Sequence, residues 1–248
     1  WLGVAGTAIG FSFLTKIVAL YTLPLFLLYL FYQIKYEPLA HTKKEFYKSV
    51  LFQSLWFIAP IIVCGVILLW YNYIRFEKLF AFGYLYGTDA NDSRDEHFGF
   101  NTPFLVGLYG LLFSTGKGFF FYNPSTILSL FGIKTFYQQY KAEALLILGI
   151  ICGSILIYSS WWAWHGDFSW GPRFLTGLSP FFILLCGKWM EDVFLCWEKC
   201  EYRHWLKRGF LFILLTVSVG VQIAGLSIKS NDYILTATNV GFFKESLF

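Results

Sequence analysis

Charged residues are scarce in this chain of 248 residues. They make up 14% of the sequence, whereas soluble domains carry about 25%. Hydrophobic residues reach 57%, and aromatic residues alone account for 22%. A water-soluble globule could not hide this much apolar surface, because every small fold keeps a large part of its surface exposed. The composition therefore excludes a soluble domain and predicts an all-α, polytopic bundle of transmembrane helices.

Signatures of several other functional classes are missing. The net charge of +4 is small, and no stretch of the sequence indicates a nucleic-acid partner. The acidic stretch 89–96 lacks the spacing of an EF-hand, so we interpret it as a solvated outer loop; its carboxylates and His97 still leave a divalent metal open as a cofactor. Of the five cysteines, Cys196 and Cys200 lie four residues apart. We interpret them as free thiols, because a zinc site needs more ligands nearby.

Seven apolar runs divide the chain. They are Leu2–Leu14, Ile17–Gln33, Val50–Tyr73, Phe119–Ile133, Ala144–Trp162, Phe174–Trp189 and Gly209–Ile228. Because a helix needs about 20 apolar residues to cross the hydrocarbon core, these runs predict six to seven spans. The run at 119–133 is short and contains Pro124, which predicts a broken or re-entrant segment. We expect residues 1–248 to form a single transmembrane domain, truncated at the N-terminus and also at the C-terminus.

Lysine and arginine concentrate in three of the links between these runs. The basic residues are Lys35, Lys43, Lys44 and Lys48 in the first link, Lys134 and Lys141 in the second, and Lys199, Arg203, Lys207 and Arg208 in the third. Cytoplasmic loops of membrane proteins carry such an excess, and the three links alternate as one side of a membrane requires. The loops Ile74–Phe104 and Trp161–Arg173 and the tail after Ile228 are therefore predicted to lie outside.

Four tryptophans crowd the predicted outer loop that follows residue 160. Trp161 and Trp162 fit an interfacial belt, since amphipathic rings favour the headgroup layer. Trp164 and Trp170 flank polar residues, and they are the better candidates for stacking against the C–H faces of a sugar. We therefore assign Trp164 and Trp170 to substrate binding.

Two lysines stand near the predicted outer boundary of the membrane. Lys16 interrupts the apolar stretch 2–33, where an ionisable residue costs about 2.5–3.5 kcal/mol. It is either a snorkelling lysine at a helix end or a point charge that holds an anionic headgroup such as a lipid phosphate. Lys117 lies between Gly116 and Gly118, which allows either an anion nest or a plain turn. The spacing of a Walker loop is absent.

Three further polar side chains share the outer loop with the tryptophans. Arg173 stands at the outer mouth of the next helix, where it either pairs with Asp167 or forks onto a phosphate. His165 can change charge near neutral pH, which makes it a weak candidate for moving a proton. We count Asp167 and His165 as substrate-binding candidates, and we expect this short, glycine-punctuated loop to be ordered.

Three segments, in order along the chain, resemble membrane glycosyltransferases of the GT-C type. They are Gly10–Lys16, which ends in Leu-Thr-Lys; Gly107–Pro124, which contains Gly116-Lys117-Gly118; and Trp162–Pro180, which contains Gly171-Pro172-Arg173. The three are similar to the LTK or LTR helix end, the GLLFSPGRGLF-Y-P stretch and the W-G-GPR-L-P stretch of that family. One departure is Thr115, which stands where the family often has proline.

The resemblance implies an integral protein of the bacterial inner membrane, related to protein O-mannosyltransferases and to the aminoarabinose transferases of lipid A. Such enzymes take a sugar from a polyprenyl-phosphate carrier and pass it to an acceptor at the extracytoplasmic face. The resemblance implies that Lys16 lies beside the carrier phosphate, with Arg173 and Lys117 as second-rank phosphate ligands. The family's catalytic carboxylate lies in a first outer loop, which we expect upstream of Trp1, so the catalytic base is unknown and the fragment alone is expected to be inactive.

Two other classes stay open. A transporter or flippase of lipid-linked intermediates would place polar residues near the midplane and show internal repeats. The sequence has no such repeat, and its ionisable residues gather at the predicted outer boundary instead. A non-catalytic membrane protein of the same fold would lack an acidic pair in its first outer loop. The sugar, the acceptor and the oligomeric state are not encoded in any motif of this sequence.

Overall fold

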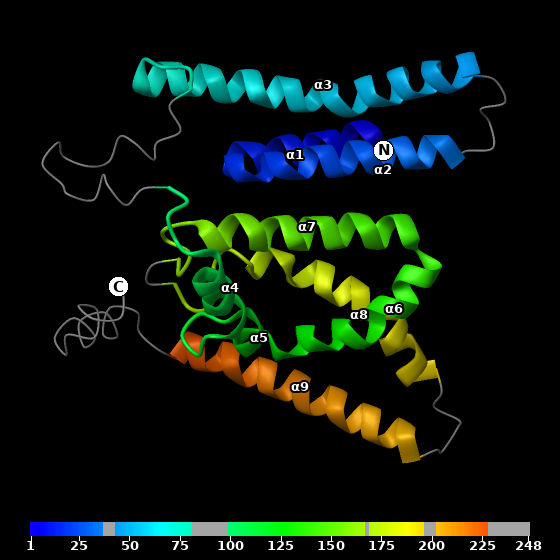
Figure 1. Cartoon of the computed structure of the whole chain (residues 1–248), viewed down its shortest axis with the longest axis vertical. Coiled ribbons are helices and arrows are strands. Elements are labelled where there is room, and N and C mark those ends of the chain that lie inside the picture. The colour runs from blue at the N-terminus through cyan, green and yellow to red at the C-terminus, as the bar shows by residue number, and fades with distance from the viewer. Residues whose placement is uncertain (37–42, 81–98, 167–168, 196–201, 228–248) are drawn as a thin grey trace, which may run out of the picture. The chain divides into compact units, whose positions relative to one another are not determined.

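The computed structural model describes residues 1–36, 43–80, 99–166, 169–195 and 202–227 of the chain. Within these ranges every regular element is a helix, which confirms the all-α prediction. The elements are α1 (Leu2–Thr15), η1 (Ile17–Tyr21), α2 (Thr22–Tyr36), α3 (Lys43–Phe76), α4 (Phe104–Phe113), α5 (Phe119–Tyr122), η3 (Pro124–Leu128), α6 (Ser129–Gln139), α7 (Lys141–Ser160), η4 (Thr176–Leu178), α8 (Ser179–Leu195) and α9 (Tyr202–Ser227) (Figure 1).

Four helical stretches are long and apolar enough to cross a membrane. They are Ile17–Tyr36, Lys43–Phe76, Lys141–Ser160 and Trp205–Ser227. Three shorter apolar helices accompany them, at Leu2–Thr15, Phe104–Phe113 and Thr176–Gly187. The chain is therefore an α-helical membrane protein, while the count of six to seven spans stays a prediction.

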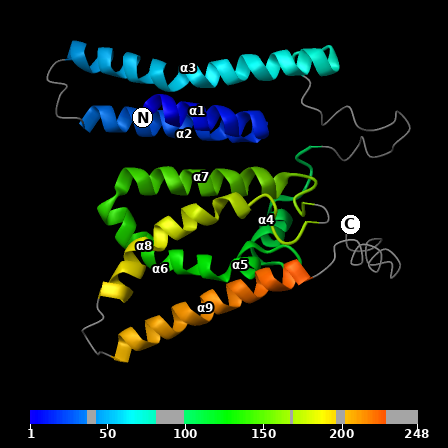
Figure 2. The same cartoon turned by 180° about the vertical axis from the view of Figure 1, so that it is seen from behind.

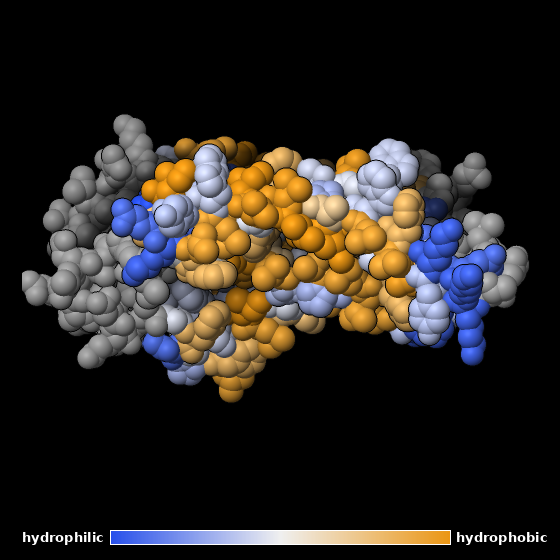
Figure 3. All heavy atoms as spheres, turned by 90° about the horizontal axis from the view of Figure 1, so that it is seen from above, coloured by the Kyte–Doolittle hydropathy of each residue, from blue (hydrophilic) through white to orange (hydrophobic). Residues whose placement is uncertain are grey.

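Two of the long helices begin inside the basic links that the sequence analysis treated as loops. α3 starts at Lys43 and has 34 residues, which corresponds to a length of about 51 Å against a hydrocarbon core of about 30 Å. α9 likewise starts at Tyr202, ahead of the predicted start at Gly209. The expectation that these links are loops throughout was wrong, because lysine and arginine are good helix formers. The face over α3 is hydrophobic along its middle and hydrophilic at both ends (Figure 3).

The chain forms two compact units. Unit 1 comprises Trp1–Phe98 and Leu145–Gly153, and unit 2 comprises Gly99–Ala144 and Ser154–Phe248. The prediction of a single transmembrane domain over residues 1–248 stays a prediction.

Small residues bring α1 close to α3 in unit 1. A Cβ added at Gly6 would lie 2.1 Å from the carbonyl oxygen of Phe57, and one at Gly10 would lie 2.6 Å from Sγ of Cys64. This Gly-x-x-x-Gly spacing allows two helix backbones to approach, as membrane helices often do. Beside this contact, α2 and α3 share a buried apolar cluster made of Leu30, Ile34, Phe57 and Ile61.

Unit 2 carries a helix that the sequence analysis missed and a break that it predicted. The ten apolar residues of α4 are too few to span a bilayer, and they were not counted as a run. The run at 119–133 is broken as expected: α5 ends at Tyr122, Pro124 opens η3, and α6 follows. Proline breaks the helix there because it has no N–H to donate and fixes its own φ.

The segments that connect the helices of unit 2 lie at two ends of the unit. α6 packs closely on α8, where a Cβ at Gly132 would lie 2.4 Å from the carbonyl oxygen of Leu185. Figures 1 and 2 agree that α4, α5, the segment after α7 and the C-terminal end of α9 lie at one end of this unit, while the α6–α7 turn lies at the other. The first of these ends is the one predicted to be extracytoplasmic.

Candidate functional site

The segment between α7 and α8 is tied to the chain that precedes α4. The amide of Trp162 donates to the carbonyl of Gly99 at 2.9 Å, and the hydroxyl of Thr102 donates to the carbonyl of Trp161 at 3.0 Å. The ring of Trp161 also meets Phe100 edge to face, with centroids 5.4 Å apart. These contacts fix the start of the loop.

Two glycines shape this loop. Gly166 and Gly171 have φ angles of +69° and +68°, in the left-handed region that side chains other than glycine rarely adopt. At Gly171 an added Cβ would also lie 2.8 Å from the ring of Tyr122. The loop therefore needs glycine at both positions, and at Gly171 it needs the space as well.

Lys117 lies in a tight turn that follows α4. Its own amide donates to Oγ of Ser114 at 3.0 Å, and the amide of Gly118 donates to the carbonyl of Ser114 at 2.7 Å. Two of the N–H groups that an anion nest would use are thus engaged inside the turn. Of the two interpretations of this segment, the geometry favours the turn.

Two of the cations of unit 2, Lys117 and Arg173, lie beside Gly166 and Ser169. The ammonium group of Lys117 donates to the carbonyl oxygen of Ser169 and lies 3.5 Å from Oγ of the same residue. Arg173 is exposed, and its Cβ lies 3.1 Å from the point where a Cβ of Gly166 would be. Oγ of Ser169 lies 3.2 Å from that same point. The structure therefore gathers Lys117 and Arg173 around a shared turn, although they are 56 positions apart (173 − 117 = 56).

The tryptophans of the loop differ in their surroundings. The ring of Trp164 lies against Gly110 of α4, 2.3 Å from where a Cβ would stand, so it packs the loop onto the helix. His165 meets Trp164 edge to face, with centroids 5.9 Å apart. Asp167, the remaining candidate of this loop, lies outside the described residues, so its pairing with Arg173 stays a prediction. Trp170, in contrast, is exposed and borders a cavity.

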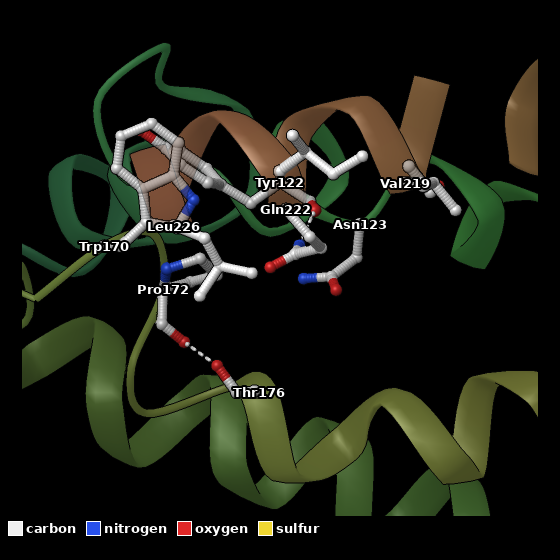
Figure 4. A pocket seen from close by; sticks show the side chains of 10 residues that line it. Tyr122, Asn123, Trp170, Pro172, Thr176, Val219, Gln222 and Leu226 are labelled. Atoms are coloured by element: carbon white, nitrogen blue, oxygen red, sulfur yellow. Dashed lines mark hydrogen bonds between the residues drawn. The ribbon is translucent and has the colours of Figure 1, made fainter. Parts of the chain in front are cut away.

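This cavity has a volume of about 380 Å³ and lies between the loop, the α5–η3 junction and α9 (Figure 4). Its apolar lining consists of Tyr122, Trp170, Pro172, Val219, Ile223 and Leu226. Its polar lining consists of Asn123, Thr176, Ser218 and Gln222. The rings of Tyr122 and Trp170 meet edge to face at 5.2 Å. The result is a mixed surface of aromatic faces, aliphatic groups, amides and hydroxyls.

The cations and the cavity are connected through the loop segment 169–173. Trp170 and Pro172 line the cavity, while their neighbours Ser169 and Arg173 stand with Lys117 at the Gly166 turn. A molecule with an anionic group and an uncharged polar part could therefore meet both features at once.

No protein-family model, curated protein or solved structure matches the chain. In the described ranges, no group of three His, Cys, Asp or Glu residues comes together to hold a metal. The acidic stretch 89–96, with His97, lies outside those ranges, as do Cys196 and Cys200.

Lys16 belongs to unit 1, where it marks a break between two helices. Its backbone is extended (φ −149°, ψ 117°), its amide donates to the carbonyl of Ser12 and its carbonyl accepts from the amide of Ala19. The side chain is half-buried. The prediction that Lys16 ends a helix is confirmed, while its contact with a lipid phosphate stays a prediction.

The sequence analysis missed the contribution of α9 to the cavity. The signals that could have revealed it are two polar residues in the largely apolar run at 209–228, Ser218 and the amide Gln222. Such a group needs a partner at membrane depth, and its Nε2 donates to the carbonyl of Tyr122 at 3.0 Å. The aliphatic residues Val219 and Ile223 gave no comparable signal, since they look like any lipid-facing side chain.

Proposed function

We propose that this protein is a membrane glycosyltransferase that moves a sugar from a polyprenyl-phosphate carrier to an acceptor at the extracytoplasmic face. The observation that carries the proposal is the gathering of Lys117 and Arg173 around one turn, directly beside a cavity lined by aromatic rings and neutral polar groups. The resemblance of the three sequence segments supports the same conclusion.

The chemistry of the transfer explains why cations belong there. The acceptor's hydroxyl oxygen forms a bond to the anomeric carbon of the sugar, and the bond from that carbon to the phosphate oxygen breaks. The polyprenyl phosphate leaves with the bonding electron pair, so negative charge grows on it. Lys117 and Arg173 stabilise that charge, and Arg173 has the fork geometry for two phosphate oxygens. The hydroxyl proton goes to a carboxylate base, which the resemblance implies and which we assign to no described residue.

The proposal includes a membrane arrangement. The protein is a multi-pass protein of the bacterial inner membrane with six to seven spans, its basic links in the cytoplasm and the 161–178 loop outside. The gathering of the connections 114–118 and 161–178 at one end of unit 2 supports this arrangement, because both segments are then on the same side. That Lys16 of unit 1 also contacts a carrier phosphate at the outer boundary is a separate prediction.

Turnover in nanodiscs tests the function. The full-length protein is supplied with a polyprenyl-phosphate-linked sugar, and the release of free polyprenyl phosphate is measured. Lys117→Ala and Arg173→Ala should each lower the rate about 10²-fold, the usual effect of removing one group that stabilises transition-state charge. Lys134→Ala, on the predicted cytoplasmic side of the same unit, is the matched control and should leave the rate unchanged.

Two results would contradict the proposal. One is carrier that crosses the membrane with its sugar–phosphate bond intact, which is the behaviour of a flippase. The other is an equal rate in the Lys117→Ala, Arg173→Ala and Lys134→Ala variants, which would separate the gathered cations from the reaction.

A further inference from the structure

We propose that the cavity at Trp170 binds a single uncharged sugar ring, and that a charged sugar is excluded from it. This inference rests on the proposed function and sharpens it, because it names the class of sugar. The carrier phosphate stays with Lys117 and Arg173, outside the cavity, and the ring attached to it enters between the loop and α9.

The polar lining indicates a hydroxyl-rich occupant. Figure 4 shows the amide groups of Asn123 and Gln222 and the hydroxyl of Thr176 turned toward the space between α9 and the loop. The Nε2 of Gln222 donates to the carbonyl of Tyr122 at 3.0 Å, and the hydroxyl of Thr176 donates to the carbonyl of Pro172 at 3.0 Å. Each donor is thus held in place by the backbone, while an amide or hydroxyl oxygen keeps lone pairs that accept from a sugar hydroxyl.

The apolar lining fits the other side of the same molecule. A pyranose ring presents C–H groups on its faces, and aromatic and aliphatic side chains pack against them. Trp170 is held in position by Tyr122, with the two rings at 87°, and by Gly225, where a Cβ would lie 2.5 Å from Nε1 of Trp170. A bare isoprenoid chain would match the aliphatic residues alone, and it would leave the amides and hydroxyls facing hydrocarbon, which is unfavourable.

The size of the cavity and the absence of charge on its described lining residues narrow the class of sugar that it would bind. A volume of about 380 Å³ is near the lower end of the range of about 300–1,000 Å³ for ligand sites, and it has room for a sugar ring. None of the described residues that line it is charged. An ammonium group on the sugar would therefore lose water there without gaining an opposite charge, and a carboxylate would have to compete with the carrier phosphate for Lys117 and Arg173.

Binding to carriers that differ only in their sugar tests the inference. The full-length protein in nanodiscs is titrated with polyprenyl phosphate alone, and with polyprenyl phosphate carrying mannose, glucuronic acid or aminoarabinose. Mannose should tighten binding at least about tenfold relative to the bare carrier, a difference that equilibrium titration resolves. The anionic and cationic sugars should give no such gain.

Two exposed valines of α9 provide a matched pair of variants. Val219 lines the cavity and Val217 does not, although both are exposed, at 58% and 47%. Val219→Phe should fill the cavity and abolish the gain from mannose, whereas Val217→Phe should keep it. A thermal unfolding midpoint measured for both variants checks that Val219→Phe is folded.

The outcomes separate the two proposals. A gain from the charged sugars equal to that from mannose, or an unchanged mannose gain in folded Val219→Phe, overturns the inference and leaves the proposed function standing. Absence of binding for every carrier, the bare one included, overturns the proposed function itself. The same titration on the wild-type protein distinguishes these results even where a variant does not fold.

Discussion

Two regions of this molecule carry cations that the sequence places near the outer face of the membrane, and they are built differently. In unit 1, Lys16 stands at a backbone break between α1 and η1, with its side chain half-buried. In unit 2, Lys117 contacts Ser169 and Arg173 lies beside Gly166, on a loop that two left-handed glycines shape next to a cavity. The comparison teaches that a cation at a helix end needs no ligand to explain it, whereas cations gathered by a constrained loop indicate a site.

The largest expected effect tests whether the unit 1 cation takes part at all. Lys16→Ala should lower transfer about 10²–10³-fold if its ammonium group stabilises the leaving phosphate, with expression intact. Lys35→Ala, in the last turn of α2, is the control. Turnover is measured by release of polyprenyl phosphate. An unchanged rate for Lys16→Ala would leave Lys16 as a snorkelling lysine and confine the site to unit 2.

The next effect tests the constraint on the unit 2 loop. Gly171→Ala combines a left-handed φ with a Cβ 2.8 Å from Tyr122, and such strain costs on the order of 1–3 kcal/mol. We expect the displaced loop to lower transfer about 10²-fold, since a shift of about 1 Å has that effect on positioned groups. Gly177→Ala has open space around it and should be close to wild type. Equal activity of the two variants would show that the loop geometry is irrelevant to transfer.

A third, smaller effect tests unit 1 as a packed scaffold. Gly6→Ala would place its Cβ 2.1 Å from the carbonyl of Phe57, while at Gly3 the nearest atom is 4.0 Å away. Overpacking of this kind costs about 1–3 kcal/mol. The thermal midpoint in detergent should therefore fall for Gly6→Ala and hold for Gly3→Ala. A midpoint equal in both would mean that α1 and α3 do not approach as described.

The smallest effect concerns one hydrogen bond within unit 1. The hydroxyl of Tyr21 donates to the carbonyl of Ile150 at 2.8 Å, and bonds of this kind contribute about 0.6 kcal/mol in a membrane protein. Tyr21→Phe should lower the stability by about that amount without changing transfer. Tyr109→Phe, an exposed tyrosine of α4, should show no change. A loss of transfer in Tyr21→Phe at unchanged stability would assign Tyr21 to the site.

Much of the fold follows from local patterns in the sequence. The scarcity of charge predicted membrane helices, and Pro124 predicted the break after α5. These features depend on composition and on a single residue whose backbone restrictions are known. That the loop around Gly166 and Gly171 is ordered stays a prediction, because residues 167 and 168 lie outside the described ranges. Helix ends were predicted less well, because hydropathy marks where a helix is apolar and not where it stops, as α3 shows.

The candidate site was predicted only in part, because it is assembled by contacts between segments that lie far apart in the sequence. Lys117, Trp170 and Arg173 were named from the sequence, as their charge or aromatic character makes them conspicuous. That Lys117 reaches Ser169, 52 positions away, is a contact that no spacing reveals. The contribution of Val219 and Ile223 on α9 could not be predicted for a different reason. In the sequence, a valine that faces lipid cannot be distinguished from one that lines a cavity.

Photo-cross-linking with a polyprenyl phosphate that carries a photoreactive group close to the phosphate tests the central claim most directly. The account predicts that the label, mapped by mass spectrometry of the full-length protein in nanodiscs, falls on residues 114–123 and 166–176, and that Lys117→Ala with Arg173→Ala in one protein removes it. Labelling that is confined to α3 or to the 134–141 turn, or that persists undiminished in the double variant, would contradict the account.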